Sequence, residues 1–469
     1  MDRKLEAYGN SNAYPFHMPG HKRNAWDFPN PYKIDITEIT GFDNLHHPSD
    51  ILKEFEQRWA NLYGAGQAYF MVNGSTGGIL TAVFSSLGPN EELLLARNCH
   101  GSAYHGAFLK DVKVHYIYPK LIKTAAGTIS GQISPKDLEE SLKRNPKIKA
   151  VLFTSPTYEG VISDVKALAE IAHSYGVKVI VDCAHGAHFG ICNSPYENPV
   201  TLGADLVIVS LHKTLPAFTS TALLLKSKDC SIEEEQIRFY LDCFETSSPS
   251  YILMASAAKC LRFLEEEGQS TFLEYEKKLK RFYEETKNLK KIKVLENLHK
   301  NHESHRITSP RDLGKILISG EGYLLGSHIF KRLSEEFYLE LEMSAGGYCL
   351  AMTSIMDSDE GLNRLKKALY EIDDTVGEKR KFNMEDFTYP KPLKVLSMKD
   401  AMEQKRVIRP LESAKDCISA GFVEFYPPGI PILAPGELIT GEIIRTIEAG
   451  IKGNLSVLGV SEKGIYIVD

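Results

Sequence analysis

A lysine stands between two apolar runs in the segment ADLVIVSLHKTLPAFTSTALLL, residues 204–225. Residues 206–209 and 222–225 have the composition of buried strands, and Lys213 lies between them. A buried ammonium group is costly unless it is paired, and a desolvated lysine has a lowered pKa, which makes it a nucleophile toward carbonyl carbon. The position therefore indicates Schiff-base chemistry, with an ordinary strand-end lysine pointing into water as the alternative.

An aspartate ends an earlier apolar run of the same kind. Asp182 closes the segment VKVIVD, and its separation from Lys213 along the chain suits one βαβ step. An aspartate at the carboxyl end of a parallel strand can cap a helix, bind a metal ion or pair with a cationic ring nitrogen. With His185 and His188 it forms the pattern D-x-x-H-x-x-H, so a transition-metal site is a rival interpretation. Because that rival leaves Lys213 unexplained, we expect no metal.

A glycine-rich turn and a loop histidine add two further groups. Gly74, Ser75 and Thr76 stand between a strand ending near residue 72 and a helical pattern, so backbone N–H groups and two hydroxyls could hold a phosphate. The turn is neither a Walker loop nor a GxGxxG motif, and a plain glycine-rich turn is the alternative. His100, in RNCHGSAYHG, could stack on a ring or make an ordinary hydrogen bond. Together these residues describe a site for pyridoxal phosphate.

The elements around these residues predict an α/β protein. Up to about residue 225, short continuous apolar runs alternate with helix-like segments, a pattern typical of a mostly parallel sheet flanked by helices. In such sheets, ligands bind beyond the carboxyl ends of the strands, where Asp182 and Lys213 fall. The expected units are an N-terminal arm (1–48), a large cofactor-binding domain (49–255), a smaller α/β domain (256–375) and a C-terminal domain (376–469), with a charged linker near residue 375.

Composition limits the partners and the compartment. The 469 residues are 43% hydrophobic and carry a net charge of −6, which argues against nucleic acid or an anionic membrane as the main partner. No segment has the length and apolarity of a membrane span or a signal peptide. The eight cysteines form no CxxC pair and fit a reducing compartment. We therefore expect a cytoplasmic protein.

The chain also resembles a known family, the bacterial Orn/Lys/Arg decarboxylases, which are pyridoxal-phosphate enzymes of the aminotransferase-like fold type I. It is similar to the shorter form, without the receiver-like N-terminal domain. The segments that carry the resemblance are FHMPGHKRN (16–24), DITEITGFDNLHHPSDILKEFEQRWANLYGA (35–65), VNGSTGGI (72–79), RNCHGSAYHGAF (97–108), SPTYEGVISDV (155–165), VDCAHGAHFG (181–190), SLHKTLPAFT (210–219), TSSPSYILMASAA (246–258) and EFYPPGIPILAPGE (424–437).

The resemblance implies roles for individual residues. Lys213 would bond the cofactor aldehyde, Asp182 would pair with the ring nitrogen and His100 would stack on the ring. The phosphate would be held by Ser75 and Thr76 of the turn that begins at Gly74, together with Ser210 and His212, and His185 would lie near the cofactor. Ser247, in TSSPSY, would reach the phosphate of a neighbouring subunit, which implies a homodimer.

The implied reaction is decarboxylation of a basic amino acid (arginine, lysine or ornithine) to the corresponding amine, as in polyamine biosynthesis. An acid must then meet the cationic end of the substrate, and Glu437 and Glu38 are the candidates. A pyridoxal-phosphate aminotransferase or lyase, or a non-catalytic paralogue, would share the same fold. One departure from the family is Ser220, which stands where many relatives carry glutamine.

Overall fold

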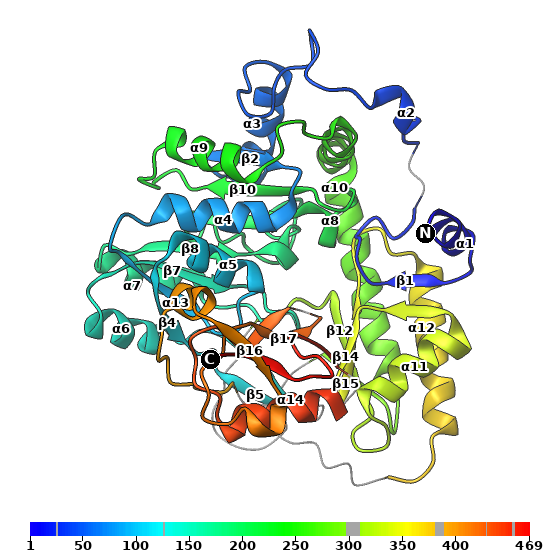
Figure 1. Cartoon of the computed structure of the whole chain (residues 1–469). Helices are drawn as coiled ribbons and strands as arrows, with labels where there is room; N and C mark the ends of the chain where they lie inside the picture. The colour runs from blue at the N-terminus through cyan, green and yellow to red at the C-terminus, as the bar shows by residue number, and fades with distance from the viewer. Residues whose placement is uncertain (25–26, 125–126, 297–309, 380–388, 428, 453–454) are drawn as a thin grey trace.

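A computed structural model describes the chain except for residues 25–26, 125–126, 297–309, 380–388, 428 and 453–454 (Figure 1). Residues 380–386 of the expected charged linker near residue 375 lie outside the described residues. In the described part of the chain, no helix is long and apolar enough to cross a membrane.

A seven-stranded sheet forms the centre of the molecule (Figure 1). Its strands, in spatial order, are β2 (Gln67–Met71), β10 (Ala222–Lys226), β9 (Leu206–Ser210), β8 (Lys178–Asp182), β7 (Ile148–Thr154), β3 (Glu92–Ala96) and β4 (Lys113–Ile117). The five strands from β9 to β4 are parallel, whereas β10 runs antiparallel to both of its neighbours. The continuous apolar runs therefore do form a mostly parallel sheet, as predicted.

Helices cover this sheet. Helix α4 contacts β8, β9 and β10, α7 contacts β8, and α6 contacts β4. Helix α3 is amphipathic and buries Phe55, Trp59 and Tyr63 on one face. The bounds of the helices in this part of the chain are α3 (Ile51–Tyr63), α4 (Gly74–Ser86), α5 (Gly101–Lys110), α6 (Pro135–Arg144), α7 (Val165–Ser174), η1 (Ala184–Gly186), α8 (Leu211–Thr214) and α9 (Glu234–Phe244).

A second, antiparallel sheet follows the long helix α10 (Tyr251–Thr286). The expected domain boundary at residue 255 falls inside this continuous helix, which contacts α3 at one end and α12 further along. The sheet has the order β11 (Lys293–Leu295), β12 (Lys315–Ser319), β15 (Tyr348–Met352), β14 (Met343–Ala345). It packs against α11 (Gly326–Phe337), which in turn contacts α12 (Asp359–Thr375).

The N-terminal arm is attached to this smaller unit. Strand β1 (Tyr14–Phe16) pairs in parallel with β13 (Leu339–Leu341), and Tyr14 donates a hydrogen bond to Asp357 at 3.0 Å. The arm also contains α1 (Asp2–Gly9) and α2 (Pro31–Ile34). A separate hairpin, β5 (Leu121–Thr124) with β6 (Gly127–Ser130), extends from the large domain.

The C-terminal segment has a small core of its own, built from residues between Leu411 and Ile467. Its elements are α13 (Met398–Glu403), β16 (Arg406–Arg409), η2 (Leu411–Ser413), β17 (Val423–Tyr426), β18 (Ile430–Leu433), α14 (Gly441–Lys452), β19 (Ser456–Leu458) and β20 (Ile465–Val468).

A buried ion pair joins this segment to the large domain. Arg97, which follows β3, places Nη2 3.1 Å from Glu437 Oε2, and both side chains are 0% exposed. The guanidinium also donates to the Ile432 carbonyl and to the Tyr104 hydroxyl, each at 2.9 Å. The carboxylate is the anion that this buried guanidinium requires, since burying either charge alone is costly.

We expect Glu437→Ala to lower the free energy of unfolding by about 3–5 kcal/mol, because it leaves the Arg97 charge buried without its partner. Urea denaturation of the purified protein measures the change. Lys405→Ala is the matched control, since it breaks an exposed ion pair with Asp469 and should leave the midpoint nearly unchanged. Equal midpoints for the two variants would contradict the role given to the buried pair.

Candidate active site

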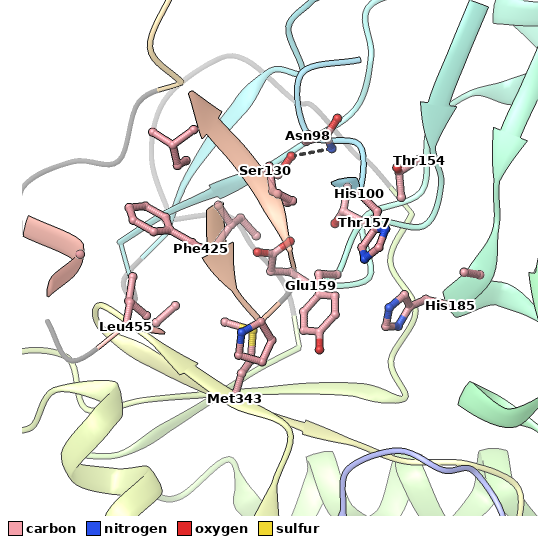
Figure 2. A pocket seen from close by; sticks show the side chains of 18 of the residues that line it. Asn98, His100, Ser130, Thr154, Thr157, Glu159, His185, Met343, Phe425 and Leu455 are labelled. Atoms are coloured by element: carbon pink, nitrogen blue, oxygen red, sulfur yellow. Dashed lines mark hydrogen bonds between the residues drawn. The ribbon is translucent and has the colours of Figure 1, made fainter. Parts of the chain in front are cut away.

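One cavity of about 850 Å³ lies where the units of the chain meet. It opens at the carboxyl ends of β7, β8 and β9 and at the N-terminus of α4, and residues 343–348 and helix α14 close its other sides. Figure 2 shows side chains from these different units directed into the same space. Nine of the predicted site residues line it, namely Gly74, Ser75, Thr76, His100, Asp182, His185, Ser210, His212 and Lys213.

Adjacent strands bring the lysine and the aspartate together. Strand β8 ends at Asp182 and pairs in parallel with β9, and Lys213 follows β9 in the short helix α8. Asp182 is only 6% exposed, and its Oδ1 accepts a hydrogen bond from the Ala184 N–H at 3.1 Å. Burial lowers the pKa of Lys213, although the charge of Asp182 opposes this shift. The cavity therefore holds an amine biased toward its neutral, nucleophilic form.

His100 is the N-cap residue of α5. Its Nδ1 lies 3.1 Å from the Ser102 N–H and 2.9 Å from the Ser102 hydroxyl, so Nδ1 accepts and Nε2 carries the proton of a neutral ring. Burial lowers the pKa of His100 and favours that neutral ring. Gly429 packs against the ring at a positive φ of 84°, and a Cβ there would stand 3.2 Å from Nε2. The loop after β17 thus holds the imidazole against the cavity.

Hydroxyl groups and N–H groups meet at the start of α4. Gly74 has a φ of +69°, a conformation that glycine adopts without strain, and it turns the chain from β2 into the helix. Ser75 Oγ lies 2.5 Å from Ser210 Oγ, which joins this turn to the end of β9. The side chain of Asn73, the N-cap residue of α4, makes no capping hydrogen bond, so the first N–H groups of the helix are available to an anion.

Two neighbours complete this end of the cavity. Burial lowers the pKa of His212 to about 4, so the ring is neutral near pH 7, and its Nδ1 lies 3.0 Å from the Thr221 carbonyl. Ser220 also lines the cavity and has a φ of +76°. Its backbone packs beside Gly74, so residue 220 is part of the wall of the predicted phosphate site.

Three predicted residues lie elsewhere. Glu437, predicted as a substrate contact, does not line the cavity, and its carboxylate is fully buried against Arg97. Glu38, in the N-terminal arm, also does not line the cavity, and its contact with the substrate stays a prediction. Ser247 is exposed and lies outside the cavity as well, and its contact with a neighbouring subunit stays a prediction.

The structure adds an acid that was not predicted. Glu159 follows β7 in the segment TYEG, and its side chain lies among those that surround the cavity (Figure 2). The Tyr348 hydroxyl donates to its Oε1 at 2.9 Å, and burial raises the pKa of this carboxyl group. Its position after a central parallel strand could have predicted that Glu159 lies at the site, because ligands bind at the carboxyl ends of such strands.

The metal interpretation finds no support in the geometry. In the part of the chain that the structure describes, no three His, Cys, Asp or Glu side chains are grouped to hold a metal ion. Instead, His188 Nε2 lies 3.5 Å from Asp312, and His185 faces two lysines.

The groups that line the cavity fit one cofactor. Pyridoxal phosphate requires an amine for its aldehyde and a carboxylate for its ring nitrogen. It also requires a neutral imidazole for its ring face and a hydroxyl-bearing helix N-terminus for its phosphate, and the cavity contains all four groups. With a mostly parallel sheet that carries one antiparallel strand, they define a pyridoxal-phosphate enzyme of fold type I.

Comparisons with known proteins identify the family. A family profile described as "Orn/Lys/Arg decarboxylase, major domain" matches residues 1–311. The protein YaaO of Bacillus subtilis is 31% identical, over 97% of this chain and 96% of its own length. The arginine decarboxylase of the same organism is 30% identical, over 99% and 96%. The crystal structure of the Francisella novicida lysine decarboxylase LdcF matches the fold with a TM-score of 0.77 and 19% identity, over 99% of this chain and 80% of that one.

The chain belongs to the Orn/Lys/Arg decarboxylase family. It is therefore a pyridoxal-phosphate-dependent amino-acid decarboxylase.

We expect Ser75→Ala to weaken pyridoxal-phosphate binding about tenfold, the loss of one hydrogen bond to a charged group. Titration of the purified protein with the cofactor, followed by absorbance, measures the dissociation constant. Ser85→Ala is the matched control, because Ser85 lies on the same helix and bonds only the Thr81 carbonyl. If Ser75→Ala binds the cofactor as tightly as the control, the hydroxyl is not a phosphate ligand.

Proposed function

We propose that the chain decarboxylates arginine to the corresponding amine and carbon dioxide, with Lys213, Asp182 and His100 as the catalytic residues. The observation that carries the proposal is the meeting of these three residues with the acid Glu159 around a single cavity. The near full-length similarity to an arginine decarboxylase supports arginine over the other basic amino acids.

Pyridoxal phosphate supplies an aldehyde that bonds amines and a ring that accepts the electron pair of a broken Cα–carboxylate bond. Lys213 contributes the amine that holds the aldehyde, and burial keeps that amine reactive. Asp182 contributes a negative charge for the ring nitrogen, which keeps this nitrogen protonated. Lys213 and His100 are the groups proposed to return a proton to Cα.

Glu159 is the acid that we assign to the cationic end of the substrate. Its carboxylate is half-buried and faces the cavity, where a guanidinium could bind both oxygens. A bound cation also offsets the desolvation that raises the pKa of Glu159, because it stabilises the ionised form. The same carboxylate would disfavour an acidic substrate.

The reaction is tested with arginine, lysine and ornithine supplied separately to the protein loaded with cofactor. We expect carbon dioxide and amine, fastest from arginine, and no product from Lys213→Ala because the attachment point is lost. Release of a keto acid instead would show an aminotransferase. Absence of product from all three would contradict the proposal.

We expect Glu159→Gln to lower kcat/KM for arginine by about tenfold to a hundredfold, chiefly through KM, because an ionic hydrogen bond is lost. Steady-state kinetics are measured with arginine and with norleucine, whose side chain is uncharged. The comparison separates recognition of the substrate's charge from recognition of its shape. Glu335→Gln, on the exposed face of α11, is the control. An equal loss for norleucine would show that Glu159 does not recognise the substrate cation.

A further inference from the structure

A second lysine is buried beside the site without a carboxylate partner. Lys315, at the start of β12, is 1% exposed, and among the described residues no carboxylate oxygen lies within 4.0 Å of its Nζ. Its Nζ lies 2.6 Å from His185 Nδ1 and 3.4 Å from Met352 Sδ. By contrast, the equally buried Lys22 bonds two backbone carbonyls and lies 4.0 Å from Asp357. The main polar partner of Lys315 is therefore a ring of the active site.

His185 connects this lysine to the catalytic one. Its other ring nitrogen, Nε2, lies 3.2 Å from Lys213 Nζ. The ring of Tyr158 packs edge-on at 4.7 Å, and the Tyr158 hydroxyl donates to Glu342, so the imidazole is held in this orientation. The result is a continuous chain of nitrogen atoms, Lys315–His185–Lys213, that crosses from the smaller sheet to the central one.

The donor rules of these groups restrict where the protons can be. An ammonium group only donates, and a neutral imidazole donates from one nitrogen and accepts at the other. Burial and the two lysine charges hold the pKa of His185 well below its ordinary value, so the ring is neutral. A neutral ring between two amines can accept from only one ammonium. When Lys315 is that ammonium, it donates to Nδ1, the ring proton sits on Nε2, and Lys213 must be neutral to accept it.

We propose that Lys315 is a positioning residue: it fixes the proton of His185 on Nε2 and thereby disfavours a positive charge on the nitrogen of Lys213. This inference rests on the role given to Lys213 under the proposed function. A residue of the smaller domain, Lys315, thus influences the protonation of Lys213 in the large domain.

The charged and titratable surroundings determine the sign of the effect. Lys213, His212 and His100 also face His185. Asp312, Glu342, Lys213 and Lys22 act on Lys315, and Lys315 in turn acts on Glu159. The Lys315 Nζ lies 5.7 Å from the centre of the Tyr158 ring. Burial lowers the pKa of Lys315 to about 7, whereas Asp312 and Glu342 favour its charge. Loss of the Lys315 charge removes a repulsion and frees His185 to accept at Nε2, and both effects raise the pKa of the Lys213 nitrogen.

The test uses the full-length protein loaded with pyridoxal phosphate and follows the cofactor absorbance as pH is varied. For Lys315→Met we expect the midpoint of the spectral transition to move to higher pH by about 1, because a positive charge on the Lys213 nitrogen is no longer opposed. Lys315→Arg, which keeps the charge, should titrate close to the unmodified protein. Lys22→Met, the same change at the other buried lysine, should show no upward shift. A Lys315→Met midpoint equal to that of the unmodified protein, or an equal shift in Lys22→Met, overturns the inference.

A second measurement does not depend on that variant folding. In ¹⁵N-histidine-labelled protein, with the His185 signals assigned by His185→Gln, the inference requires a proton on Nε2 and none on Nδ1, and the opposite tautomer overturns it. Borohydride reduction followed by peptide mapping keeps the two proposals apart. If the cofactor is fixed on a residue other than Lys213, the proposed function fails. If it is fixed on Lys213 and the midpoints do not differ, only this inference fails.

Discussion

The cost of burying an amine at the edge of the central sheet is the constraint on which the site depends. Lys213 has no carboxylate within ion-pair distance among the described residues, and Asp182 acts on it through charge from the neighbouring strand. Because β8 and β9 end side by side, the site meets one requirement of the Lys213 amine and an opposite requirement of Asp182. The amine stays reactive because it is desolvated, and the aspartate keeps a negative charge in the same cavity for a cationic ring nitrogen.

The sequence predicted this part of the molecule well because its signals are local. Continuous apolar runs mark strands buried on both faces, and the order of such strands places Asp182 and Lys213 at one edge. The turn at Gly74 is equally local, because the few residues around this glycine are enough to predict a positive φ at the start of a helix. None of these inferences required knowledge of how distant segments pack.

The features that the sequence did not predict are contacts between units. Glu437 stands in a motif of the family, yet its carboxylate neutralises Arg97, more than three hundred residues earlier in the chain. The expected domain boundary at residue 255 lies inside α10, which is one continuous helix that contacts both α3 and α12. The burial of Lys315 could not be predicted from the sequence. A lysine at the start of an apolar strand is usually solvated, and only the packing of β12 beside the cavity shows that this one is buried.

Glu437 and Glu159 show how the partner of a buried carboxylate distinguishes a structural charge from a functional one. Glu437 and Glu159 are both withdrawn from bulk water, but Glu437 already has a cation in contact, whereas Glu159 accepts a hydrogen bond from a neutral tyrosine. A buried ion pair that is already formed gains little from a ligand and loses much if it is broken. Among the described residues no cation forms an ion pair with the Glu159 carboxylate, although the charge of Lys315 acts on it, and a cationic substrate would supply such a contact. The same distinction applies to the lysines, since Lys22 is satisfied by carbonyls, while Lys315 and Lys213 share one neutral imidazole between them.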